Sequence, residues 1–342
     1  MASNILLLGA SGYIGGSILT TLLKSKGYNI SALVRKESQA EVLRGEGVKA
    51  SVFEGLDDEE AIFGEARGCD IVIAAADARH AGAAKACLRG LAERQKVTGN
   101  STSYTAGASM VADWPITGSR VDTSIHSDID EDVYTLERSY DEPWSGVRDV
   151  NQIVVAFGEE VGVRTYIVIP PLIYGEGIGF FTKGFGQVSM YVDLALKHKT
   201  AVTLGEGSGI WSIIHINDLC TLYHLLVTAI INTSSTLKCG KEGYYYAESG
   251  SRSWKSIAEQ IGVVGHNLGV FENTDVKTVE MKEVADAFYK GDERLAESVL
   301  GSNSRIKGDR ARRILGWKPE FSEGGFEGEV ERVVRELLEK EG

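Results

Sequence analysis

Short apolar runs alternate with amphipathic helical patterns along the first half of the chain. A run such as NILLLG, residues 4–9, does not alternate, which is typical of a strand buried on both faces of a parallel sheet. The strands predicted in this half cover residues 4–9, 29–35, 49–55, 69–76, 101–107 and 164–171. Because a helical pattern separates each strand from the next, the order predicts an α/β fold with a Rossmann-type, doubly wound parallel sheet.

The second half is mixed, and its end is largely helical from residue 262 onward. A length of 342 residues exceeds that of one typical domain, so two units are expected. We expect a dinucleotide-binding Rossmann domain and a smaller, mostly helical C-terminal substrate domain. The expected boundaries are 1–170 with 212–262 for the first, and 171–211 with 263–342 for the second.

The alternation breaks between Ala108 and Trp144, where polar and acidic residues dominate. Loops of this length are usually either functional or disordered. Because Tyr134, Tyr140 and Trp144 are present, a surface loop that folds over a cleft is favoured, with a disordered insert as the alternative.

Charge and cysteine content exclude several classes of function. A net charge of −12 argues against nucleic-acid binding, which needs clustered Lys and Arg. The four cysteines lack metal-ligand spacing, so reduced thiols of a cytoplasmic protein are expected. No apolar run approaches the roughly 20 residues that span a bilayer, and we expect neither a signal peptide nor a membrane partner.

A glycine-rich turn, GASGYIGG, directly follows the first predicted strand. Gly9, Gly12 and Gly15 have the spacing of a dinucleotide-binding turn. Gly9 would permit the tight turn, Gly12 would let the backbone approach a pyrophosphate, and Gly15 would let the helix pack on the sheet. The helix N-terminus would then offer N–H groups to the anion. The alternative is a turn that binds nothing.

The second predicted strand ends with Arg35 and Lys36 instead of the Asp or Glu usual in NAD sites. Cationic side chains there suit a 2′-phosphate, and the Ser11 hydroxyl could add a donor. NADP(H) is therefore favoured, with NAD(H) as the alternative if Arg35 is only an exposed strand-end residue.

Several motifs in order along the chain resemble the extended and atypical short-chain dehydrogenase/reductase superfamily, especially its fungal epimerase/dehydratase-like and NmrA-like members. They are GASGYIG, GLDD (55–58), CDIVIAAAD (69–77), TAGAS (105–109), IPPLIYGEGIG (169–179), IIHINDL (213–219) and RARRILGWKP (310–319). The resemblance implies that residues such as Leu56 and Ala76 line the adenosine site. Together with the turn, the expected cofactor-binding residues are Gly9, Ser11, Gly12, Tyr13, Ile14, Gly15, Arg35, Lys36, Leu56, Ala75, Ala76, Thr105, Ala106, Asn151, Pro170 and Ile173.

The resemblance also implies a catalytic Tyr-x-x-x-Lys pair, and this chain lacks it. The tyrosine would act as acid or base, and the lysine would lower its pKa. Those positions fall on Val147 and Asn151. Asn151 could still donate a hydrogen bond to the cofactor ribose, and Arg148 could supply a charge. Alternatively, these residues only pack and cap a helix.

Thr105 and Tyr174 are the candidate catalytic residues that remain. Thr105 ends the fifth strand, where the family carries a Ser or Thr, and Tyr174 follows the sixth strand at the ligand-binding edge of the sheet. Tyr174 could instead pack on the nicotinamide or on a domain joint. Of the histidines, His126 could protonate a product or be a solvated loop residue, whereas His80 and His215 are expected to be structural.

Hydride transfer needs no protein nucleophile, so loss of the pair does not exclude redox chemistry. The sequence favours an NADP(H)-dependent oxidoreductase that reduces C=O, C=N or activated C=C in a small molecule, in a pocket lined by Trp144, Tyr174, Phe180 and Phe181. The alternatives are a non-catalytic redox sensor of the NmrA-like kind, and an epimerase, lyase or cyclase that uses bound NADP(H). The resemblance also implies a homodimer.

Overall fold

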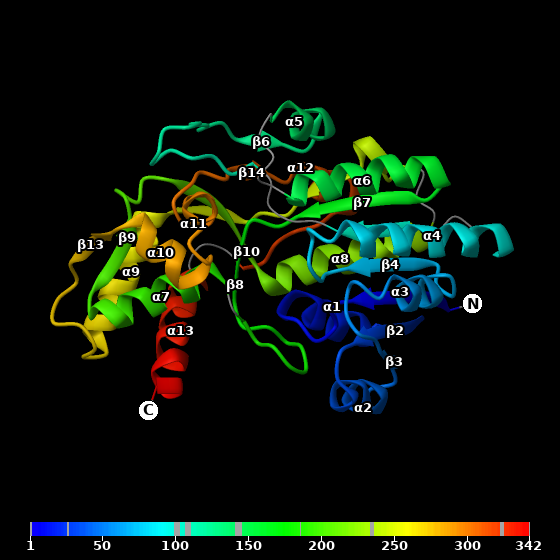
Figure 1. Cartoon of the computed structure of the whole chain (residues 1–342), viewed down its shortest axis with the longest axis horizontal. Helices are drawn as coiled ribbons and strands as arrows, with labels where there is room; N and C mark the ends of the chain where they lie inside the picture. Colours follow the sequence, from blue (N-terminus) through cyan, green and yellow to red (C-terminus); the bar gives the residue numbers. More distant parts are fainter. Residues whose placement is uncertain are drawn as a thin grey trace.

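The computed structural model has a larger unit built on a parallel sheet and a smaller helical unit beside it (Figure 1). It describes residues 2–25, 27–98, 103–106, 111–140, 146–184, 186–232, 236–321 and 325–341.

The larger unit contains a seven-stranded parallel sheet with the order β11-β7-β5-β4-β1-β2-β3. The interior strand β1 is buried from Ile5 to Leu8, which explains why that apolar run does not alternate. The predicted α/β fold with a doubly wound sheet is confirmed. The strands are β1 (Ser3–Leu8), β2 (Tyr28–Val34), β3 (Lys49–Val52), β4 (Ile71–Ala74), β5 (Ser103–Ala106), β7 (Arg164–Ile169) and β11 (Tyr244–Tyr246).

Helices cover both faces of this sheet, and each face has its own apolar cluster. One face packs against α1 (Tyr13–Leu23), α2 (Glu37–Gly45), α8 (Ile216–Ile231) and α12 (Asp309–Leu315). The other face packs against α3 (Glu59–Ala66), α4 (Ala81–Thr98) and α6 (Gly146–Val161). The carboxyl ends of β1 and β4 meet where the strand order reverses, which is where open α/β sheets bind ligands.

The smaller unit is mostly helical and has a third apolar cluster; it lies on the left in Figure 1. Its helices are α7 (Gln187–His198), α9 (Trp254–Asn267), α10 (Met281–Phe288), α11 (Glu293–Leu300) and α13 (Gly325–Glu341). Its strands are β8 (Leu172–Tyr174), β9 (Ala201–Leu204), β10 (Ile210–His215), β12 (Gly250–Ser253) and β13 (Val276–Val279).

Two helices pack in a different unit from the one in which the predicted domain boundaries place them. The side chains of α9 belong to the cluster of the smaller unit, although residues up to 262 were assigned to the Rossmann domain. Conversely, Ala311 of α12 packs in a cluster of the large sheet, although residues 263–342 were assigned to the substrate domain. Helical periodicity predicts that these helices exist, but it carries no information about which core each one joins.

The polar segment between β5 and α6 is folded in its described part, residues 111–140. Its short strand β6 (His126–Ser127) pairs in parallel with β14 (Ile306–Lys307), and α5 (Val133–Ser139) follows. The Asp113 carboxylate accepts hydrogen bonds from Asn303 N at 2.6 Å and Asn303 Nδ2 at 2.9 Å. Residues 111–140 therefore form a folded insert anchored to the C-terminal region, and the disordered alternative does not hold for them.

A second anchor is Asp128, which is fully buried. Its carboxylate accepts hydrogen bonds from the backbone N–H groups of Tyr246, Asp309 and Arg310. Burial raises the Asp128 pKa to about 6, although these donors oppose the shift. Within the described ranges, no helix combines the length and apolar character of a membrane span.

Candidate functional site

The glycine turn between β1 and α1 has an open N-terminus. Gly9 has a φ of +87°, and a Cβ atom there would lie 2.4 Å from the Ala75 carbonyl oxygen. Gly12 is the N-cap of α1, with no side-chain cap and no acidic residue in the first turn. Such a helix end suits an anion such as a pyrophosphate. The predicted tight turn at Gly9 is confirmed.

Gly15 allows a close approach between the start of α1 and the chain directly after β1. A Cβ atom on Gly15 would lie 2.3 Å from the Gly9 carbonyl oxygen, whereas one on Gly12 would be 3.2 Å from the same atom. Gly15 therefore allows the first turn of α1 to pack against the residue that directly follows β1.

The loop after β8 lies against this turn. Tyr13 donates a hydrogen bond from its phenol to the Gly175 carbonyl oxygen at 2.6 Å, and Thr182 Oγ1 donates to the Ser11 carbonyl oxygen at 3.1 Å. The expected lining residues Phe180 and Phe181 pack against the core cluster beneath α1. The Tyr13 hydroxyl thus holds this loop over the glycine turn.

At the end of β2, the side chains of Arg35 and Lys36 are exposed. Among the described residues, neither side chain forms a hydrogen bond or ion pair. The next acidic residue, Glu37, pairs with Arg44 Nη1 at 2.5 Å. Both cations are thus available to a phosphate at the edge of the sheet where the adenosine half of a dinucleotide would lie.

A small cavity of about 20 Å³ brings several expected cofactor residues together. Its lining includes Leu8 at the end of β1, Leu56, Ala76 after β4, and Asn151 of α6. These residues come from four separate parts of the chain, and they meet at the carboxyl edge of the sheet.

The positions of the missing pair lie in the first two turns of α6. Val147 lines a larger cavity of about 460 Å³. Asn151 is 2 % exposed, and its Nδ2 donates a hydrogen bond to Glu137 Oε1 of α5 at 2.7 Å. This amide nitrogen, predicted to donate to a ribose hydroxyl, is therefore engaged by a carboxylate.

The larger cavity lies between the two units, because its walls come from both. Gly146 and Val147 contribute from α6, Trp211 from β10, and Leu295 from α11. The guanidinium groups of Arg79 and Arg294 also border this cavity. Among the described residues, the lining is Arg79, Ala112, Gly146, Val147, Trp211, Asp292, Arg294, Leu295, Ser298 and Val299.

Comparisons with known proteins agree with this geometry. The model of an NAD(P)H-binding family matches residues 9–113. The fold matches dTDP-glucose 4,6-dehydratase DesIV from Streptomyces venezuelae, with a TM-score of 0.67, 15% identity, and coverage of 98% of this chain and 97% of that one. UDP-glucose 4-epimerase from Thermotoga maritima matches with a TM-score of 0.64, 16% identity, and coverage of 99% and 100%. Residues 9–113 thus match an NAD(P)H-binding family, and the fold as a whole is that of the epimerase and dehydratase structures.

Among curated relatives, oxidase ucsJ from an Acremonium species is 28% identical over 355 aligned positions, which cover 100% of this chain and 99% of that protein. A decarboxylating sterol-4-alpha-carboxylate 3-dehydrogenase from Dictyostelium discoideum is 40% identical, but over only 20% of this chain and 21% of that one. The proteins that this chain is similar to include an oxidase, a dehydrogenase, a dehydratase and an epimerase, so they differ in reaction type.

Within this fold, the candidate acid Tyr174 is a packed side chain. It is 1 % exposed, and its hydroxyl donates to the Phe321 carbonyl oxygen at 3.3 Å. The rings of His215 and Phe326 lie edge-on at 5.1 and 5.2 Å. Burial raises the Tyr174 pKa to about 12. This arrangement favours the packing interpretation over catalysis.

The remaining expected residues lie along neighbouring strands. Thr105 pairs with Ile73 and Tyr166 in the sheet, and Ala106 pairs with Ile167, but the side chains of β5 are outside the described set. Trp144 lies outside the described residues altogether. Pro170 is buried between β7 and β8, and Ile173 pairs with Ile214.

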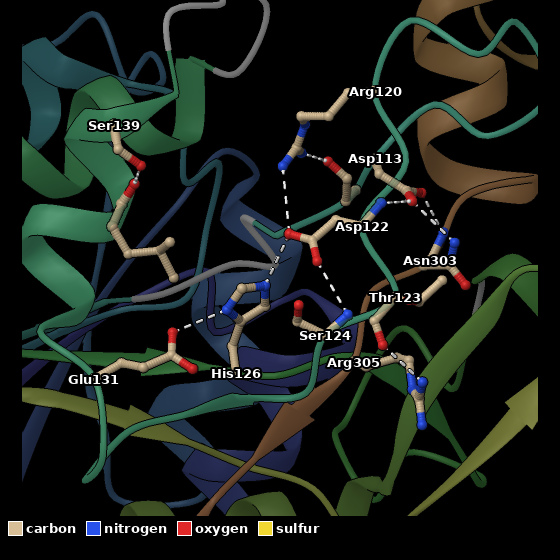
Figure 2. Close-up of polar contacts among 12 residues, drawn as sticks. Asp113, Arg120, Asp122, Thr123, Ser124, His126, Glu131, Ser139, Asn303 and Arg305 are labelled. Atoms are coloured by element: carbon tan, nitrogen blue, oxygen red, sulfur yellow. Dashed lines mark hydrogen bonds and ion pairs between the residues drawn. The ribbon is translucent and has the colours of Figure 1, made fainter.

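His126 is buried, so the solvated-loop interpretation is wrong. Figure 2 shows its ring between two carboxylates, with Nε2 3.2 Å from Asp122 Oδ2 and Nδ1 2.9 Å from Glu131 Oε2. Because both ring nitrogens have partners within the insert, neither is directed to a substrate, and His126 holds the insert together.

His80 and His215, which were predicted to be structural, both make contacts that cap helices. His80 Nδ1 accepts a hydrogen bond from Ala83 N at the start of α4. His215 Nδ1 caps α8 by accepting from Asn217 N, and its ring stacks on Phe321 at 3.8 Å. Burial lowers the His215 pKa to about 4, so its ring is neutral near pH 7.

Sequence reasoning missed Glu137, which lies in a segment expected to be a loop. Its side chain is 1 % exposed and accepts hydrogen bonds from Asn151 and from the Tyr244 hydroxyl, the latter at 2.6 Å. Burial raises the Glu137 pKa to about 7, although both donors and Arg148 oppose the shift. Only the apolar and aromatic residues around it, such as Val133 and Tyr134, hinted that the segment is folded.

No group of three or more potential metal ligands occurs in the described part of the chain. The four cysteines are free thiols; Cys69, Cys87 and Cys220 are buried and Cys239 is half-buried.

Proposed function

We propose that this chain is an NADP(H)-dependent oxidoreductase that acts on a small molecule without the Tyr/Lys pair of its superfamily. The observation that carries the proposal is the 460 Å³ cavity that borders Val147. At that position the superfamily places its catalytic tyrosine, so the cavity lies where a substrate would meet the cofactor. A volume of this size is in the range of small-molecule sites.

The residues of the glycine turn fit a dinucleotide, because the N-terminus of α1 is uncapped and a Cβ atom at Gly9 or Gly15 would collide with the backbone. Arg35 and Lys36 support NADP(H) over NAD(H), since a 2′-phosphate needs cations there and a carboxylate would repel it. When bound, the reduced nicotinamide supplies a hydride.

The protein's part is to bind the substrate, to orient it against the cofactor, and to exclude water. The described walls of the cavity contain no tyrosine, histidine or lysine, so they offer little general acid. We therefore propose a substrate whose C=O, C=N or activated C=C needs little help from an acid, such as an iminium ion. The free thiols are consistent with a cytoplasmic location, which we also propose.

Parallel titrations with NADPH and NADH test the cofactor assignment. Followed by the fluorescence of the reduced nicotinamide, NADPH should bind at least about tenfold more tightly, because each charge-assisted hydrogen bond to the phosphate is worth roughly 1.5–3 kcal/mol. Tighter binding of NADH would contradict the assignment.

A second candidate is an epimerase or dehydratase, since the similar solved structures carry those names. Such an enzyme returns its hydride to the substrate within each cycle, so it would not consume NADPH. Net consumption of the cofactor therefore separates the two functions. A non-catalytic sensor has less support, because it needs no cavity at Val147.

A further inference from the structure

A buried carboxylate of the insert, that of Glu137, contacts the side chain of Asn151. Glu137 lies on α5 of the insert, whereas Asn151 lies on α6 of the Rossmann unit, and both side chains are at most 2 % exposed. The contact between them is a charge-assisted hydrogen bond of 2.7 Å from the amide nitrogen to the carboxylate. A second donor, the Tyr244 hydroxyl on β11, holds the other carboxylate oxygen at 2.6 Å.

This bond determines which end of the Asn151 side chain is available to a ligand. An amide has two N–H donors at one end and a carbonyl acceptor at the other. Because Nδ2 is directed to Glu137, the carbonyl oxygen is turned away from the insert. Asn151 also lines the small cavity with Leu56 and Ala76, where cofactor-binding residues meet.

We propose that Glu137 is a positioning residue that fixes the Asn151 amide so that its Oδ1 accepts a hydrogen bond from a hydroxyl of the cofactor's nicotinamide ribose. The superfamily's lysine would donate to that ribose, so the polarity of the contact is reversed here. This inference rests on the proposed NADP(H) site.

The ionised form of Glu137 holds the Asn151 amide most strongly, because its hydrogen bonds are charge-assisted. A carboxylate accepts from both Asn151 Nδ2 and the Tyr244 hydroxyl, whereas a carboxylic acid must itself donate one hydrogen bond. The charged and titratable groups that face Glu137 are Arg148 on α6, and Tyr244 and Tyr246 on β11. Because the Glu137 pKa is raised to about 7, cofactor binding that selects the carboxylate should weaken as the pH falls through this value.

The test compares NADPH with 2′,5′-ADP, which has the adenosine and the 2′-phosphate but no nicotinamide ribose. The ratio of the two dissociation constants cancels effects on the adenosine half, including titration of the 2′-phosphate. We expect Glu137→Leu to weaken NADPH about tenfold relative to 2′,5′-ADP, equivalent to one lost hydrogen bond. Tyr244→Phe, which leaves the Glu137–Asn151 bond in place, is the matched control and should leave the ratio unchanged at about pH 9, where Glu137 is ionised in both proteins.

Glu137→Gln provides a readout that does not depend on tolerance of an apolar residue. It removes the titration and keeps the shape, and its carbonyl oxygen can still accept from Asn151 Nδ2 while its amide N–H donates to the Tyr244 hydroxyl oxygen. The ratio should therefore lose its pH dependence between about pH 6 and pH 8. An unchanged ratio in Glu137→Leu, or a pH dependence that persists in Glu137→Gln, would refute the positioning role alone. If the wild-type protein bound neither NADPH nor 2′,5′-ADP, the proposed function would fail with it.

Discussion

Replacing Gly15 by alanine should destabilise the fold and weaken NADPH binding. The added methyl group would lie 2.3 Å from the Gly9 carbonyl oxygen, which is backbone and cannot rotate away. The turn must then shift, at a cost of about 1–3 kcal/mol typical of overpacking. Because this turn would hold the pyrophosphate, we expect the dissociation constant of NADPH to rise at least about tenfold.

The matched control is Gly64→Ala. Gly64 lies in helix α3, and a Cβ atom there would have no neighbour within 4 Å. The same chemical change should therefore stabilise the protein by about 0.5–1 kcal/mol and leave NADPH binding unchanged. Urea denaturation and NADPH titration of both variants check this. Equal effects at the two glycines would show that Gly15 has no special role.

Replacing Arg35 by glutamine should remove most of the preference for NADPH over NADH. Arg35 is exposed at the end of β2, so its loss should not disturb the core. A charge-assisted hydrogen bond to the 2′-phosphate is worth roughly 1.5–3 kcal/mol, so NADPH should bind about 10–100-fold more weakly. NADH, which has no 2′-phosphate, should change by less than about twofold on the same reasoning.

Arg335→Gln on α13 is the control for net charge, since it removes one positive charge from the smaller unit. Its effect on either cofactor should be small because solvent and salt screen distant charges. If Arg35→Gln weakened NADPH and NADH equally, Arg35 would contribute to general affinity and not to phosphate recognition.

Sequence patterns predicted the sheet because its signals are local. The run before Gly9 must be buried on both faces, and the glycines after it have few other uses at that spacing. The fold of the insert was harder to predict, because it is stabilised by contacts between residues that are distant in the sequence. Asp113 binds Asn303, and Asp128 binds the backbone at Asp309, and neither partner can be found from composition or periodicity.

The candidate site was predictable from the sequence only in part. Residues of the glycine turn and of strand ends meet as expected, because parallel strands place their carboxyl ends at one edge. The chemistry around Asn151 was not predictable, since its partner Glu137 comes from the insert and Tyr244 from a strand about 100 residues farther along the chain. Tyr174 looked available because β8 ends there, but Phe326 and His215 cover its ring.

The central claim is that a site without the Tyr/Lys pair still transfers hydride from NADPH. Its most direct test is to mix the purified protein with NADPH and a panel of ketones, enones and preformed iminium ions, and to follow the absorbance of the reduced nicotinamide. We expect net NADPH consumption with at least one member, and faster consumption with iminium ions than with ketones, because a charged electrophile needs no acid. Tight NADPH binding with no consumption by any member of the panel would contradict the account.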